Sequence, residues 1–251
     1  KRGYKPKTKA EIDSVAEENS TTAEVFNTLD ETASKTEDWV IKNQKYIFVL
    51  IGFVAVVVLG YLGYNEFIAK PAQTEAMNDM YQSQKYYNEA VTGTEKDSLF
   101  NLALNGGEGK YGMLDIISEH SGTPAANLAN YYAGMAYLNM KDYKKAVSYL
   151  EDYNGKDEAT GPIAKGAIGD AFVQLNQKED ALRFYVQAAE MRNNELTAPL
   201  YLFKAGIIAL DLGKANDAVK YFNRIKEDFS SSTEAANIDV FIGKAEVLAN
   251  K

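Results

Sequence analysis

Residues 121–151 read SGTPAANLANYYAGMAYLNMKDYKKAVSYLE. Apolar residues recur here at intervals of three and four, a spacing that is typical of helices rather than strands. Within the stretch, the small residue Gly134 lies twelve positions before a second small residue, Ala146, and the large residues Tyr149 and Leu150 follow soon after. Small residues let two helix backbones approach closely, and large residues fill the wedge beside them. The stretch therefore predicts two packed helices joined by a turn.

The same pattern returns twice toward the C-terminus. Its Gly and Ala pairs are Gly134 with Ala146, Gly169 with Ala181, and Gly206 with Ala218. The glycines are 35 and then 37 residues apart, and a nearly fixed period of this length indicates stacked repeats. The pattern resembles the tetratricopeptide repeat, a helix-turn-helix unit of about 34 residues. The resemblance covers residues 124–251, although the family's first-helix Trp and the Pro at the repeat end are missing.

The resemblance implies an all-α fold with a tetratricopeptide-like α-solenoid. Residues 233–251 form a last partial unit, which we expect to be a capping helix that shields the final repeat. Residues 65–123 are expected to supply leading helices, including residues 77–91 and residues 111–120.

Residues 46–64 read YIFVLIGFVAVVVLGYLGY, nineteen residues without a charge. About 20 apolar residues are needed to cross a bilayer as a helix, so this segment predicts a single transmembrane helix. Forty-five residues precede it, which is unlike a cleaved signal peptide. Aromatic side chains gather at both ends, as expected at the depth of lipid headgroups. These are Trp39, Tyr46, Tyr61, Tyr64 and Phe67.

The charges beside the span predict its orientation. Lys35, Lys42 and Lys45 precede it, whereas only Lys70 follows at a comparable distance. The positive-inside rule then places residues 1–45 in the cytoplasm and the rest of the chain outside the membrane.

Within the predicted cytoplasmic tail, Thr21 and Glu24 resemble a capping box, and Val25, Phe26 and Leu29 follow at helical spacing. We expect a short amphipathic helix there, lying on the membrane. The basic first nine residues leave two interpretations open, a solvated end and a contact with anionic lipid or RNA.

Composition excludes several function classes for the 251-residue chain. Its net charge of -8 repels phosphate backbones, so nucleic acid is not the expected partner. The chain has no cysteine and one histidine, His120, which leaves little for a thiolate metal site or a catalytic triad. Residues 107–112 match GxGxxG, but no strand precedes them as a dinucleotide site requires. We therefore expect no cofactor, no metal and no enzymatic activity.

In tetratricopeptide superhelices the first helix of each repeat lines a concave groove. The matching positions here are Tyr131, Met135, Asp170, Val173, Phe203, Ile207 and Lys244. Since most of them are apolar, they favour an apolar or extended polypeptide ligand held by adaptable side chains. The same residues are equally consistent with packing between repeats, and the sequence leaves both interpretations open.

Small residues also gather on one side of the predicted span. They are Gly52, Ala55, Gly60 and Gly63. A face of this kind lets another transmembrane helix approach closely, although glycine is common in such helices anyway.

An anchor followed by a divergent repeat domain resembles the YfgM-like family, ancillary subunits of the SecYEG translocon in Gram-negative bacteria. Residues 121–151 and the string ANIDVFIGKAEVL, residues 236–248, carry the resemblance. It implies a single-pass inner-membrane protein with a periplasmic domain. This protein would work beside the translocon and a membrane-anchored peptidyl-prolyl isomerase chaperone, and would meet secreted polypeptides as they emerge. A scaffold for another envelope complex, without client binding, is the alternative.

Overall fold

The computed structural model describes Glu37 and residues 39–250. The chain divides into two compact units, Lys1–Glu66 and Phe67–Lys251. The amphipathic helix expected around residues 21–33 lies outside the described residues, and so does the basic tip.

In the first unit, residues 39–64 are α-helical and include the predicted span. They belong to the helix Trp39–Thr92, whose most apolar 18-residue window has a mean hydropathy of 2.5 and no buried residue. A π-helical turn, η1 (Asn65–Ala69), follows the span. One helix of the described chain is therefore long and apolar enough to cross a membrane.

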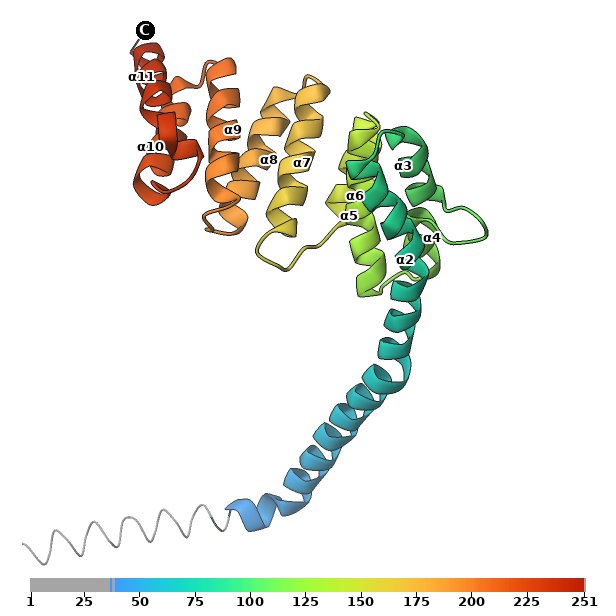
Figure 1. Ribbon diagram of the computed structural model, residues 1–251. Coiled ribbons are helices and arrows are strands. Elements are labelled where there is room, and N and C mark those ends of the chain that lie inside the picture. The colour runs from blue at the N-terminus through green and yellow to red at the C-terminus, as the bar shows by residue number, and fades with distance from the viewer. Residues whose placement is uncertain (1–36, 38, 251) are drawn as a thin grey trace, which may run out of the picture. The chain divides into compact units, whose positions relative to one another are not determined.

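The second unit is built of helices joined by short connections (Figure 1). They are α2 (Lys70–Thr92), α3 (Lys96–Asn105), α4 (Met113–Glu119), α5 (Pro124–Asn139), α6 (Tyr143–Asp152), α7 (Thr160–Gln174), α8 (Lys178–Met191), α9 (Ala198–Asp211), α10 (Ala215–Asp228), the 3-10 turn η2 (Glu234–Asn237) and α11 (Ile238–Ala249). The described residues contain no strand, only an isolated bridge between Gly107 and Lys110. The all-α prediction is confirmed.

The helices α5 to α10 form three pairs. In each pair, a side chain of the second helix packs directly against a glycine of the first. A Cβ built on Gly134 would lie 2.5 Å from the Leu150 side chain of α6. The corresponding distance is 2.6 Å from Gly169 to Tyr185 of α8, and 2.3 Å from Gly206 to Phe222 of α10. Ordinary contacts between carbon atoms are about 3.5–4.0 Å long, so only glycine fits at these three positions. The predicted close approach of paired helices is confirmed.

The turn inside each pair also repeats. Lys141, Asn176 and Gly213 have φ angles of 64°, 59° and 73°, the left-handed conformation that ends many helices. The N–H of the residue after each one donates to a carbonyl five positions back, as in Asp142 to Tyr137 at 2.9 Å. This is the Schellman arrangement, which satisfies carbonyls at the end of the first helix and turns the chain toward the second.

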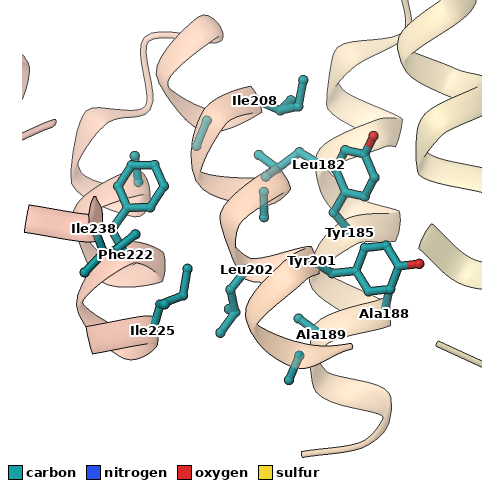
Figure 2. Close-up of a cluster of buried hydrophobic side chains, with 14 of the residues drawn as sticks. Leu182, Tyr185, Ala188, Ala189, Tyr201, Leu202, Ile208, Phe222, Ile225 and Ile238 are labelled. Atoms are coloured by element: carbon teal, nitrogen blue, oxygen red, sulfur yellow. The ribbon is translucent and has the colours of Figure 1, made fainter. Parts of the chain in front are cut away.

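The hydrophobic core runs along the stack. The largest cluster joins α8, α9, α10 and α11 around side chains such as Tyr201, Leu202, Phe222 and Ile225 (Figure 2). Ile238 and Ile242 of α11 are buried against it, so the last helix packs on the third repeat. Its role as a cap stays a prediction.

The leading helices pack on the first repeat. Phe100 of α3, Met113 and Ile116 of α4, and Met80 of α2 join the buried side chains of α5. The helices expected at residues 77–91 and 111–120 correspond to α2 and α4, whereas α3 was not predicted. The domain boundary at residue 124 stays a prediction.

A longer joint, residues 153–159, links the first and second repeats. Side chains from the turn between α8 and α9 hold its carbonyls. Arg192 Nη2 donates to the carbonyl of Lys156 at 3.1 Å, and Asn194 Nδ2 donates to the carbonyl of Glu158 at 2.8 Å. The far end of the second repeat thus braces the joint before it.

Candidate protein-binding site

The seven predicted groove residues lie on the first helices of the repeats, as expected. Tyr131 and Met135 are on α5, Asp170 and Val173 on α7, Phe203 and Ile207 on α9, and Lys244 on α11. Ile207, which is 37% exposed, and Lys244 are open to solvent, whereas the other five are partly buried. The groove assignment itself stays a prediction.

Both aromatic residues of the predicted groove, Tyr131 and Phe203, take part in internal packing. The Phe203 ring lies 4.8 Å from that of Phe241 and 5.9 Å from that of Phe222, centroid to centroid. Tyr131 lies 5.2 Å from Tyr153 at the start of the joint. Edge and tilted contacts of this kind stabilise the stack, so these rings offer a ligand only part of their surface.

Asp170 anchors a polar network across three helices. Its Oδ1 accepts a hydrogen bond of 2.6 Å from the Tyr185 hydroxyl of α8. Lys204 Nζ of α9 donates to Oδ1 and Oδ2 of the same carboxylate at 2.7 and 2.9 Å. The Tyr185 ring stacks on that of Tyr201 at 6.3 Å, and the Lys204 ammonium lies over both rings (Figure 2 shows the two tyrosines). Asp170 is therefore a neutralised bridge between repeats rather than a free charge.

The network shifts the titration of its tyrosines. Burial, assisted by the hydrogen bond to Asp170, raises the pKa of Tyr185. Burial and the negative charge of Asp170 raise the pKa of Tyr201. Both hydroxyls stay protonated at neutral pH, so Tyr185 remains a donor to Asp170. Sequence reasoning missed Lys204 as the partner of Asp170, because the two lie 34 residues apart whereas the spacing between these repeats is 37, which aligns Asp170 with Ile207.

Two surface hollows lie outside the network of Asp170, Tyr185 and Lys204. One, of about 540 Å³, opens between the N-terminal end of α5 and the joint, where Asn127 and Asn154 exchange hydrogen bonds of 3.1 and 2.9 Å. Its lining is Gly122, Thr123, Pro124, Asn127, Leu128, Tyr153, Asn154, Lys156 and Asp157. The other, of about 400 Å³, runs along α2 beside Tyr81. Neither was predicted from the sequence.

The residues first considered for chemistry have structural partners. His120 caps the end of α4, and its Nε2 lies 2.9 Å from Asp79 Oδ2 of α2. Residues 107–112 connect α3 to α4. No group of three metal-ligating side chains occurs among the described residues. The absence of enzymatic activity stays a prediction.

The small-residue face of the span is uncovered. A Cβ added at Gly52, Gly60 or Gly63 would meet nothing within 4 Å, and Ala55 is exposed. A partner helix at this face stays a prediction.

Two segments of the chain match the tetratricopeptide repeat family, residues 128–156 and residues 201–232. They cover most of the first and third helix pairs, so this comparison and the geometry agree on a chain with tetratricopeptide repeats. No curated protein sequence matches the chain.

Among solved structures, the chain is similar to the nearly identical TPR-like repeats of a putative kinesin light chain from Podosopora anserina. The identity is 11%, the TM-score is 0.49, and the match covers 71% of this chain and 88% of that one. A second structure of the same repeats, carrying a single substitution, matches with 12% identity, the same TM-score and the same coverage.

Proposed function

We propose that this chain is a membrane-anchored, periplasm-facing helper of the Sec translocon that binds partner proteins and emerging secreted polypeptides. One observation carries the proposal: an uncovered apolar helix precedes a helical solenoid that exposes Ile207 on the first helix of its third repeat. The expected groove positions Met135 and Val173 are partly buried, and their contact with a ligand is part of the proposal. The resemblance of residues 121–151 to translocon-associated repeat proteins supplies the identity of the channel.

The proposal divides the work between the two units. An anchor keeps the repeat domain close to chains leaving the channel, at a local concentration that can reach the millimolar range for short tethers. Weak binding to an extended apolar segment is then enough, and a soft surface built on methionine and aliphatic side chains suits many sequences. The membrane-anchored isomerase chaperone is expected as a further neighbour at the same site.

Site-specific photo-cross-linking of the full chain in membranes tests this function. A photoreactive residue at Ile207, the most exposed apolar member of the groove, should cross-link to secretory chains stalled in the channel. The same residue at Leu196, which is 70% exposed in the turn before α9, is the control because it is apolar but off the groove. Equal labelling from both positions, together with purification from mild detergent without SecY, would reject the proposal.

The second candidate is a scaffold for another envelope complex that binds folded partners and no clients. The packing of Phe203 and Tyr131 and the neutralised Asp170 favour it, because they leave little free apolar surface along the repeats. A scaffold would copurify with one folded complex and would not suppress aggregation of unfolded proteins, whereas a client-binding helper would suppress it.

A further inference from the structure

The last helix, α11, stands where a fourth repeat would begin. Gly243 lies 37 residues after Gly206, the same spacing that separates Gly206 from Gly169. Each earlier glycine of the series is filled by a side chain from the next helix, but a Cβ at Gly243 would meet nothing within 4 Å. The glycine of α11 therefore keeps an open site for a closely packed helix.

Apolar side chains flank that open glycine on the same face. Val240 lies one turn before it and is 71% exposed, and Val247 lies one turn after it and is 61% exposed. At 100° per residue, these three residues fall within about 60° of one another on the helix. Ile242 and Ala245, on the opposite face, are buried in the stack. An exposed apolar stripe on a terminal helix indicates an interaction surface.

The charges beside the stripe identify the occupant. Asp239 and Glu246 form one edge of it, and Lys244 lies on the other edge, five positions after Asp239. In a parallel pair of identical helices, the acidic edge of one copy meets the basic edge of the other. In an antiparallel pair, the two acidic edges would meet each other, and so would the two basic edges. The stripe is thus complementary to a second parallel copy of itself.

The side chains of the stripe suit the same arrangement. In heptad terms, Val240 and Val247 occupy a positions and Gly243 occupies the d position between them. The paired helices would then have two layers of valine with one layer of glycine between them. In two-stranded parallel coiled coils, β-branched residues at one seam position are typically combined with leucine at the other; here glycine takes the second position and lets the backbones approach more closely. An isolated helix of twelve residues would be marginal in water, but the stack already holds α11 in shape, so pairing carries little ordering cost.

We propose that α11 pairs in parallel with α11 of a second copy of this chain, through Val240, Gly243 and Val247, with Asp239 of each copy facing Lys244 of the other. Asp239 already accepts from Lys226 Nζ at 2.8 Å within its own chain. Both side chains of that pair are more than half exposed, so it contributes little and its carboxylate can also accept from the second copy.

Cysteine cross-linking of the full chain in membranes tests the pairing, because the chain has no cysteine of its own. Val240→Cys and Val247→Cys variants, each treated alone with a short thiol cross-linker, should give covalent dimers several-fold above a Leu196→Cys control. That control is as exposed as Val240 but lies off α11. Yields no higher than the control would overturn the proposal. So would dimers that form only when the two cysteine variants are mixed, which is the antiparallel outcome.

Charge exchange tests the register independently. In the Val240→Cys background, Lys244→Glu should lower the dimer yield several-fold, and adding Asp239→Lys to the same chain should restore it. The same dimer yield in all three variants would overturn the predicted contact between Asp239 and Lys244. Neither experiment needs a translocon or a client, so its result is separate from that of the proposed function.

Discussion

Replacing Gly206 by Ala tests whether the paired helices of a repeat need glycine at their point of closest contact. The new Cβ would lie 2.3, 2.5 and 2.9 Å from three atoms of the Phe222 ring. To restore an ordinary contact of about 3.5 Å, the ring has to move by more than about 1 Å. It has no room, because it is fully buried and lies between the rings of Phe203 and Phe241 at 5.9 and 5.7 Å.

The magnitude follows from two opposing effects. Overpacking of this kind costs about 1–3 kcal/mol, whereas replacing glycine by alanine inside a helix stabilises by about 1 kcal/mol. Gly243→Ala is the matched control, since it occupies the same repeat position with nothing within 4 Å in the single chain, and melting is measured on dilute protein in which the proposed α11 pair is dissociated. It should therefore show only the gain. The difference between the two variants isolates the overpacking, about 1–3 kcal/mol, or roughly 2–4 °C in melting temperature for each kcal/mol.

Thermal unfolding of the full chain in mild detergent, followed by circular dichroism, measures the difference. Gly206→Ala should melt below Gly243→Ala, and adding Phe222→Leu to Gly206→Ala should cost less than Phe222→Leu does alone, because the smaller side chain relieves the clash. If Gly206→Ala raised the melting temperature as much as Gly243→Ala, the close approach and the repeat register would be refuted.

Lys141→Gly should stabilise the domain by about 1 kcal/mol, because glycine adopts the left-handed turn without strain; an unchanged or lower melting temperature would contradict this. Lys204→Met should destabilise by about 1 kcal/mol by leaving the partly exposed carboxylate of Asp170 without its cation, and Asp170→Asn in the same chain should recover part of that loss in a double-mutant cycle. Hydrogen bonds from the Thr160 hydroxyl and from backbone N–H groups lower the pKa of Asp157 to about 2, so its contribution to stability is present above the ordinary aspartate pKa of about 3.9 and is lost as pH falls toward 2. Asp157→Asn should accordingly be less stable than wild type at neutral pH but not at pH 2, and parallel melting curves across that range would exclude the effect. Protease added to spheroplasts should digest residues 65–251 and spare the N-terminal tail, whereas the reverse pattern would reject the orientation.

The repeat architecture could be predicted because its signal is periodic and local. Gly134, Gly169 and Gly206 stand at near-constant spacing, and only a close helix contact requires glycine inside a helix. The leading helix α3 escaped prediction because its ten residues lie outside the period and carry too short an apolar pattern.

The site could be predicted only as far as the helix face. The repeat register places Asp170 and Phe203 on the first helices, but it does not show that Lys204 and Phe241 already engage them. Those contacts depend on side-chain rotamers and on the angle between neighbouring repeats, which a single sequence does not specify. In the same way, His120 was placed at a helix end while its partner Asp79, 41 positions earlier, was missed.

The joint at residues 153–159 is hydrogen-bonded to the turn between α8 and α9, so movement between the first and second repeats is coupled to movement between the second and third. Arg192 and Asn194 follow the second repeat, yet they hold carbonyls of the segment that precedes it. Pulling α6 away from α7 would therefore load the connection between α8 and α9 as well. A force applied to one end of the domain therefore acts on both connections. We expect the repeats to separate one at a time only after the hydrogen bonds of Arg192 and Asn194 have broken.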